Sequence, residues 1–428
     1  MKHHISIFSM ALTALMSLSL VYAQEATEPE PAEQPPGRAA QLTLDDLRTF
    51  TDIFNQARKN YVEEVDDKTL LDAAIRGMLH ELDPHSSYLP VKELEELNDT
   101  ALGRYSGIGI EVQDREGKIV VSAIINGSPA DKAGINPGDT ITSINGIPVE
   151  GQPSSEAMDE LLGEPESVVV LHLVPSEGEE RDVQITRQYI KLPTLNFELL
   201  DGSIAYFKMA TFHQASAKDL EQALESIESD GIELSGIVID LRGNPGGILR
   251  QAVAIADGFL DEGPIVSTRG RNSAMQLEFT ANPGQWIPGI PLMILVDHST
   301  ASASEVLAGA LQDNGRAVIV GERTFGKGSV QSVLPLRNGA GIKLTTARYY
   351  TPSGRSIQAE GILPDVVIQW SGEASGKQGS LREVDLERHL GNDSQAGTTK
   401  PVHSKINLEE FPLQEFLQAL RNAGEIPE

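Results

Sequence analysis

Residues 236–247 read GIVIDLRGNPGG, and this stretch decides the fold of the larger part of the chain. Its first five residues are mostly apolar, as in a strand buried on both faces, and a glycine-rich turn then leads into a helical pattern over Ile248–Leu260. A turn of this kind presents backbone N–H groups at a helix N-terminus, where a phosphate or a developing oxyanion would be stabilised. The stretch therefore predicts a strand, an anion-binding turn and a helix.

Strands and helices alternate on both sides of this stretch. We expect strands at Ser203–Met209, Leu292–Val296 and Ala317–Val320, helices at Ser216–Glu228 and Ala303–Asp313, and further strands at Val330–Leu334 and Ile342–Tyr349 that extend the same sheet. Such alternation is typical of a mainly parallel sheet covered by helices. Residues 191–370 are thus predicted to form a layered α/β core.

Composition limits the function. The chain has 428 residues and a formal net charge of -28, with no Lys/Arg-rich block, so a nucleic-acid partner is not expected. There is no cysteine, which excludes disulfides and a lipid-modified cysteine anchor. No cofactor is expected. The histidines are scattered and no H-E-x-x-H helix occurs, so a metal site is not expected either.

The two ends of the chain differ from its middle. Residues 1–23 have a short charged start, an apolar run and the small-residue ending Val21-Tyr22-Ala23, which predicts a secretory signal peptide and a periplasmic location; an uncleaved anchor is the alternative. Residues 24–40 are rich in Glu, Pro, Ala and Gln and read as a disordered linker. Residues 41–104 show two amphipathic helices. Residues 371–428 read as a polar linker and a final helix, which either docks on another copy or closes the domain.

Short strand patterns that are separated by Gly and Pro residues predict a separate α+β unit over residues 105–190. The string Gly127-Ser128-Pro129-Ala130, followed by Pro137-Gly138-Asp139 and Asn145-Gly146, supplies a helix start and two turns in a specific order. Taken together it resembles the PDZ domain of bacterial envelope proteases. By that resemblance Gly107, Ile108, Gly109 and Ile110 form a carboxylate-binding loop, and a peptide adds as a strand beside Ile108–Val112. A glycine-rich strand start without a ligand is the alternative.

Two further motifs lie in the predicted α/β core. Residues 299–305 read STASASE at a strand-to-helix junction, where Ser302 is either a nucleophile near the helix dipole or an ordinary N-cap paired with Glu305. Residues 321–328 read GERTFGKG and nearly match a P-loop, but Gly328 replaces the required hydroxyl and a strand follows instead of a helix. What remains is Lys327, held between glycines in a tight loop.

From about Leu44 to Trp370 these motifs in order resemble the carboxyl-terminal processing peptidases, or tail-specific proteases. The resemblance implies a multidomain α/β and α+β protein with a helical N-terminal region, a PDZ domain and a layered ClpP/crotonase-like serine-protease core. It implies that Ser302, Lys327 and Gln331 are catalytic, with an interval of 25 positions between the first two. The oxyanion is expected to bind backbone N–H groups of Gly246 or Gly247 together with Ala303.

The resemblance implies a serine endopeptidase acting on proteins with free C-termini, with an adaptor or activator protein as a further expected partner; the signal-like N-terminus predicts its export, and the terminal helices favour self-association. A Ser-His-Asp triad is the rival mechanism, with His298 and Asp297, or with His85 or His213. A catalytically silent PDZ adaptor that binds protein C-termini is the alternative function, and an acyl-CoA enzyme with the same layered core is a third. Intact Ser302 and Lys327 disfavour the adaptor, and the signal peptide disfavours the acyl-CoA enzyme.

Overall fold

The computed structural model describes residues 42–115, 117–149, 151–152, 154–176, 178–369, 381–393 and 406–426. The chain divides into two compact units, residues 1–70 and 71–428. Within the described ranges, no helix has both the length and the apolar character needed to cross a bilayer. The predicted signal peptide and linker lie outside the described residues.

The first helix, α1 (Leu44–Asn60), begins where the helical spacing of apolar residues begins. Thr43 caps it, because the Thr43 hydroxyl accepts from the Asp46 N–H while the Asp46 carboxylate accepts from the Thr43 N–H. The second helix, α2, spans Asp67–His80. Both helices were predicted, with an acidic turn between them.

The central sheet of residues 191–370 is mainly parallel, as predicted. Its strand order is β10 (Asn196–Leu200), β11 (Ile204–Lys208), β12 (Gly236–Asp240), β15 (Leu292–Val296), β16 (Val318–Gly321) and β19 (Val366–Val367), with only the β10–β11 pair antiparallel. β12 and β15 are buried along their whole length, because helices cover both faces of the sheet.

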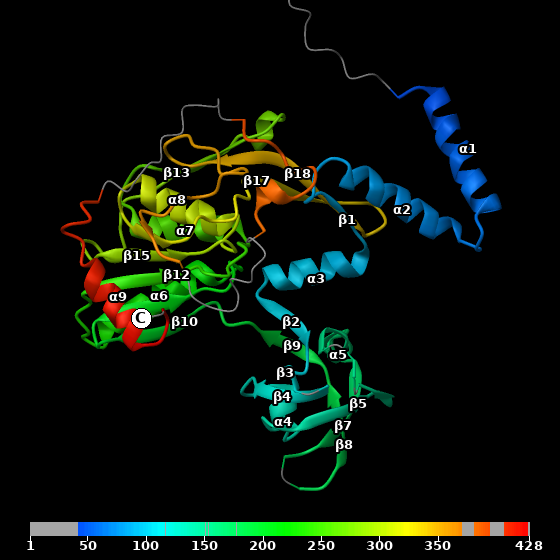
Figure 1. Cartoon of the computed structure of the whole chain (residues 1–428), viewed down its shortest axis with the longest axis horizontal. Helices are drawn as coiled ribbons and strands as arrows, with labels where there is room; N and C mark the ends of the chain where they lie inside the picture. The colour runs from blue at the N-terminus through cyan, green and yellow to red at the C-terminus, as the bar shows by residue number, and fades with distance from the viewer. Residues whose placement is uncertain are drawn as a thin grey trace, which may run out of the picture. The chain divides into compact units, whose positions relative to one another are not determined.

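Alternate residues of these strands face two different apolar cores. On one face pack α6 (Ser216–Ser229), α7 (Leu249–Phe259) and α8 (Ala303–Asp313), and on the other packs α9 (Leu413–Asn422). Figure 1 shows α7 and α8 side by side over the central strands, and α9 in red on the opposite side. Phe416 and Leu420 of α9 are buried in this second core, so within this chain the final helix closes the domain.

The prediction that the two late strands extend the central sheet is wrong. β17 (Ser329–Pro335) and β18 (Gly341–Tyr350) pair with each other and belong to a second sheet with β1 (Ser87–Leu89), β13 (Pro264–Arg269) and β14 (Glu278–Thr280). Tyr349 and Val266 of this sheet share the apolar core of α7 and α8, so these helices lie between two sheets. Strand patterns alone do not show which sheet a strand joins.

The predicted PDZ unit has its own sheet and its own core. The sheet order is β3 (Ile110–Arg115), β4 (Lys118–Ile124), β5 (Thr140–Ile144), β7 (Val168–Val174) and β8 (Arg181–Thr186), with β6 (Ile147–Pro148) beside β5. Helices α4 (Pro129–Lys132) and α5 (Ser154–Leu161) accompany it. The chain enters and leaves through the paired strands β2 (Arg104–Gly107) and β9 (Gln188–Lys191).

Three short elements were not predicted: the helix α3 (Val91–Ala101), which precedes this unit, and the 3-10 turns η1 (Ser273–Met275) and η2 (Glu383–Asp385). The helix α3 carries Val91, Leu94 and Leu97 at helical spacing, although none of its residues is buried. Its apolar pattern was therefore present in the sequence and was not recognised.

Candidate active site

Ser302 lies where β15 turns into α8, at the N-cap position of the helix. Its backbone has φ 55° and ψ -117°, a conformation that L-residues rarely adopt and that is common at functional sites. Every residue of α8 behind it is buried, whereas Ser302 itself is only half-buried. The turn therefore presents a partly accessible hydroxyl on a rigid helix end.

Asp297 fixes the turn that leads to Ser302. Its carboxylate accepts hydrogen bonds from the backbone N–H groups of Ser299 and Thr300, both at 2.9 Å, and from the N–H of Gly243 at 3.1 Å. The Gly243 contact joins this turn to the glycine-rich loop after β12. The Ala301 N–H also donates to the Asn244 carbonyl at 3.0 Å, so the two loops are held as one unit.

The glycine-rich loop lies so close to the Ser302 turn that a side chain on Gly246 does not fit. A Cβ atom on Gly246 would lie 2.9 Å from both the Ala301 carbonyl oxygen and the Ser302 Cβ, and Gly246 has φ +104°. The Gly246 N–H donates to Asn244 Oδ1 at 2.9 Å and is therefore engaged inside the loop. Within the described ranges, the N–H groups of Gly247 and Ala303 have no such partner, and Gly247 is exposed. Of the predicted oxyanion donors, Gly247 and Ala303 remain available.

Glu305 connects the Ser302 turn with the Lys327 loop. One oxygen of its buried carboxylate, Oε2, accepts from the Ser302 N–H at 2.8 Å and from the Lys327 N–H at 2.9 Å. The other, Oε1, accepts from the Gly326 N–H at 2.7 Å and from the Thr324 hydroxyl at 2.5 Å. All four acceptor positions of the carboxylate are used, which requires the ionised form. From the sequence, Glu305 is predicted only as part of a helix cap. Its second role was missed, because no local pattern shows that the Lys327 loop donates to its carboxylate.

Lys327 is half-buried between the glycines of its loop. Burial lowers the pKa of its ammonium, and the neighbouring Lys343 lowers it further, while Glu383, Glu305 and Asp83 oppose the shift. A lower pKa increases the fraction of Lys327 that is a neutral amine at a given pH, and the neutral amine can act as a base. In the described structure the side chains of Ser302 and Lys327 form no direct hydrogen bond, and such catalytic contacts often tighten only when substrate binds.

Gln331 lies on β17, two residues after the first residue of the strand. Its amide Nε2 donates to the Ser329 hydroxyl at 2.9 Å and to the Thr345 hydroxyl at 3.3 Å. Within the described residues it makes no hydrogen bond to Lys327. Gln331 is thus hydrogen-bonded to Ser329, which directly follows the Lys327 loop, and to Thr345. Its role in orienting the lysine stays a prediction.

The geometry does not assemble a Ser-His-Asp triad from the candidates. His298 Nδ1 lies 3.4 Å from Glu322 Oε2, and the Asp297 carboxylate is occupied by backbone donors. His85 pairs with Glu383, and neither ring nitrogen of the buried His213 is hydrogen-bonded to a side chain of the described part of the chain. Burial also lowers the pKa of His213.

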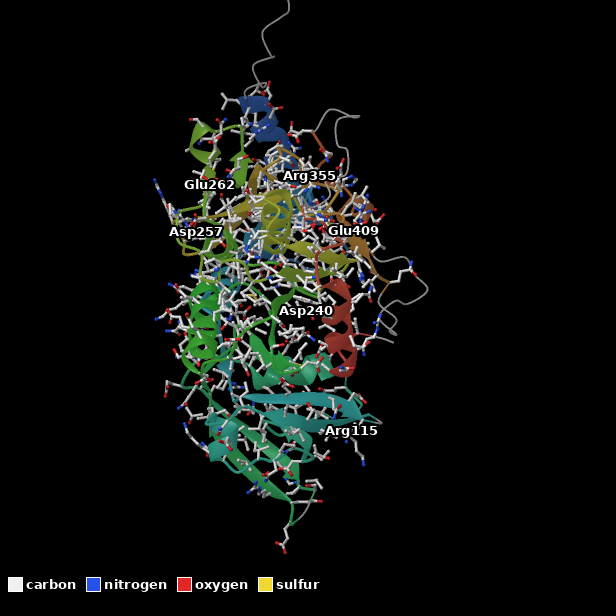
Figure 2. The ribbon with its side chains drawn as sticks, turned by 90° about the vertical axis from the view of Figure 1, so that its left-hand side faces the viewer. Arg115, Asp240, Asp257, Glu262, Arg355 and Glu409 are labelled. Carbon is white, nitrogen blue, oxygen red and sulfur yellow. The ribbon has the colours of Figure 1, made fainter. Side chains whose placement is uncertain are left out.

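A buried charged cluster supports the start of the glycine-rich loop. Asp240 ends β12, is fully buried, and is labelled in Figure 2. Arg242 binds its carboxylate through two nitrogens, at 2.9 Å and 2.6 Å, and the Tyr206 hydroxyl donates to it at 2.6 Å. Arg242 also donates to the Glu425 carbonyl at 2.9 Å, which ties the C-terminal segment to this loop. Burial and the adjacent carboxylates raise the pKa of Tyr206, so its hydroxyl stays a donor.

The predicted carboxylate-binding loop has the required free donors. Gly107 ends β2, Ile108 is buried in the core of the unit, and Ile110 begins β3. The strand was predicted to begin at Ile108. It begins two residues later because Gly109 has φ +81°, which is not an extended conformation. A Cβ on Gly109 would also lie 2.4 Å from the Ser128 Cβ, so the position requires glycine. In the described part of the chain the N–H groups of Ile108 and Gly109 donate to no other residue, and β3 is the edge strand of its sheet and contacts α5.

Three family models match successive parts of the chain. The model of Peptidase family S41 matches residues 203–368, that of the PDZ domain matches residues 99–174, and that of the activating protease CtpB N-terminal domain matches residues 10–92. The carboxy-terminal-processing protease of Bartonella bacilliformis is 40% identical over 356 residues, which cover 82% of each chain. The chain belongs to the carboxy-terminal-processing protease family.

This assignment makes the chain a peptidase with a PDZ domain. The carboxy-terminal processing protease CtpA of Bacillus subtilis is 35% identical over 315 residues, which cover 73% of this chain and 67% of the relative. Among solved structures, the photosystem II D1 C-terminal processing protease is 33% identical and is matched over 75% of this chain and 87% of its own, with a TM-score of 0.45.

The peptidase activity is expected to decrease as the pH falls through about 7. Burial raises the pKa of Glu305 to about 7 from its ordinary 4.5, while its four hydrogen-bond donors limit the shift. Below this value the carboxyl gains a proton and can no longer accept from all four of its donors, which include the N–H groups of Ser302 and Lys327. Protonation of Lys327 acts in the same direction. The measurement is kcat/KM against pH at constant ionic strength.

The pH dependence of the unfolding free energy distinguishes this loss of activity from acid unfolding. Because the folded state holds the Glu305 proton more tightly than the unfolded state does, the Glu305 contribution to stability is largest below pH 4.5 and is lost as the pH rises to about 7. As the pH rises from 4.5 to about 7, we therefore expect activity to increase while the contribution of Glu305 to the unfolding free energy decreases. A flat activity profile across pH 7, in protein that stays folded, would contradict the assigned role of Glu305.

Proposed function

We propose that this chain is an exported serine endopeptidase that cleaves envelope proteins after its PDZ domain has bound their C-terminal tails, with Ser302 and Lys327 as the catalytic dyad. One observation supports this most directly: a single carboxylate oxygen of Glu305 accepts from the backbone of both Ser302 and Lys327. The Ser302 turn and the Lys327 loop are thereby fixed at one place, beside the glycine-rich loop in which, among the described residues, the Gly247 N–H has no hydrogen-bond partner.

The reaction follows from these positions. The neutral amine of Lys327 accepts the proton of the Ser302 hydroxyl, and Ser302 Oγ attacks the scissile carbonyl. The N–H groups of Gly247 and Ala303 bind the resulting oxyanion. Lys327 returns the proton to the leaving amine, which leaves an acyl-enzyme on Ser302. Lys327 then takes a proton from water, and the hydroxide attacks the acyl carbonyl. As the bond to Ser302 Oγ breaks, Lys327 gives this proton to Oγ, which releases the new C-terminal carboxyl group and restores the dyad.

The PDZ domain supplies substrate selection in this proposal. The N–H groups of Ile108 and Gly109 would bind the terminal carboxylate of a tail, and the tail would add as a strand along the free edge of β3, facing α5. Export rests on the signal-like residues 1–23. Self-association and a separate activator protein are further predictions that the family relationship suggests.

The test uses an unfolded protein substrate in two forms, one with a free apolar C-terminus and one with the same terminus amidated. We expect the free form to be cleaved about tenfold or more faster, because amidation removes the charge that the loop N–H groups bind. The Ser302→Ala variant should bind the free tail as wild type does but should not cleave it.

Equal cleavage of both forms would contradict tail recognition. Cleavage by Ser302→Ala at the wild-type rate would contradict the assigned nucleophile. Tight tail binding by a wild-type protein that cleaves nothing would instead support the adaptor function.

A further inference from the structure

Glu383 is a buried carboxylate that lies outside the matched peptidase region and that the dyad mechanism does not use. Its side chain is 1% exposed. Oε2 lies 2.8 Å from His85 Nε2, and Oε1 accepts from Gln358 Nε2 at 2.8 Å. The Glu383 N–H donates to the Phe325 carbonyl at 3.1 Å. A carboxylate this deeply buried requires such partners to compensate its lost hydration.

Through Gln358 this carboxylate reaches the loop of Lys327. Gln358 Oε1 accepts from the Gly328 N–H at 3.0 Å, and the Ala359 N–H donates to the Gly326 carbonyl at 2.8 Å. The packing is so close that a Cβ on Gly328 would lie 2.2 Å from the Gln358 nitrogen. Glu305 thus holds one side of the Lys327 loop, and Gln358 holds the other.

Through His85 the same carboxylate is connected to the segment before β1. The His85 N–H donates to Asp83 Oδ1 at 2.8 Å, and the Thr345 hydroxyl donates to the same oxygen at 3.0 Å. Thr345 in turn accepts from Gln331 at 3.3 Å. The turn at residues 83–86 is therefore connected to the Lys327 loop through Glu383 and Gln358. It is also connected to Gln331 of β17 through Thr345.

We propose that Glu383 is a positioning residue for Lys327, oriented by His85 and acting through Gln358 on the Gly326–Gly328 loop. The inference rests on the proposed function, since it assigns to Glu383 a role in positioning Lys327, the base of the proposed dyad. It implies that the segments before the PDZ domain and after the peptidase core complete the active site.

The charge of Glu383 also acts on the lysine. The charged groups that face Lys327 are Glu383 from η2, Glu305 from α8, Asp83 from the turn before β1, and Lys343 from β18. The three carboxylates favour the ammonium form, and Lys343 disfavours it. Removing the charge of Glu383 should therefore lower the pKa of Lys327 and make the neutral base available at lower pH.

The test compares three variants of the full chain. Glu383→Gln keeps the shape and can still accept from Gln358, so its main effect should be to move the acidic limb of kcat against pH to lower pH. His85→Ala leaves the buried carboxylate without one partner, and kcat should fall by about tenfold or more with KM little changed. His85→Gln offers an amide donor to Glu383 and should recover most of that loss. Thermal unfolding of each variant reports on folding.

The outcomes separate this inference from the proposed function. Full activity of Lys327→Ala would overturn the dyad, and this inference with it. Loss of activity in Lys327→Ala, together with a wild-type kcat and pH profile in both Glu383→Gln and His85→Ala, would overturn the inference alone. If His85→Ala fails to fold, the pH profile of Glu383→Gln decides: a shift to lower pH supports the positioning role, and an unshifted profile overturns it.

Discussion

Replacing Lys327 by alanine is expected to reduce kcat by a factor of about 10⁴ or more, because removal of one member of a catalytic unit of this kind has effects of that size. Lys327→Arg should be equally inactive, since the guanidinium of arginine does not lose its proton in proteins and cannot act as a base. The arginine variant is informative because it keeps the positive charge and much of the side-chain length. Single-turnover cleavage of the free-tail substrate measures both variants.

Lys218→Ala is the matched control, because Lys218 lies exposed on α6. It should cleave at the wild-type rate. Both Lys327 variants should still bind the tail peptide with wild-type affinity, since the carboxylate-binding loop belongs to a separate core. Appreciable activity in Lys327→Arg would show that the lysine acts by its charge and not as a base.

Glu305→Gln is expected to be the most damaging change among residues that do not themselves react. The glutamine amide has one acceptor oxygen, whereas the carboxylate accepts four hydrogen bonds, from Thr324, Gly326, Lys327 and Ser302. At least two buried donors lose their partner, and each unsatisfied donor destabilises the fold by about 1–3 kcal/mol. We expect kcat to fall by about 100-fold or more, because the Ser302 and Lys327 loops are no longer held to one atom.

Denaturant unfolding and kcat, measured on the same preparation, test this prediction. Glu225→Gln on the exposed face of α6 makes the same chemical change where no buried network depends on it, and it should affect neither quantity. A Glu305→Gln protein with wild-type stability but lowered kcat would restrict Glu305 to a role in aligning the loops. Wild-type values for both quantities would contradict the bridging role.

Much of the site could be read from the sequence because its residues sit in strings with local rules. The apolar run in residues 236–241 predicted β12, and the glycine-rich turn after it predicted the start of a helix, which is α7. Because Gly328 does not fit a P-loop, the pattern indicated instead that Lys327 is a lysine held in a tight loop. The order of these strings supported the family to which the chain belongs.

Other features depend on residues that are distant in sequence, and no local pattern encodes them. The strands β17 and β18 look the same whether they join the central sheet or a second one, and only packing against α7 and α8 decides it. Glu305 looks like a helix cap until the Lys327 loop folds back onto its carboxylate. His85 and Glu383 are separated by 298 positions, so their pairing exists only in the folded chain.

The sequence by itself thus determined the kind of protein, its order of regions and the chemical types available for catalysis, because these depend on local spacing and local backbone preference. The tertiary structure decided which N–H groups remain free, which carboxylates surround the lysine and how the two loops are held together. These depend on burial, which makes each polar group find a partner wherever the fold brings one within hydrogen-bond distance.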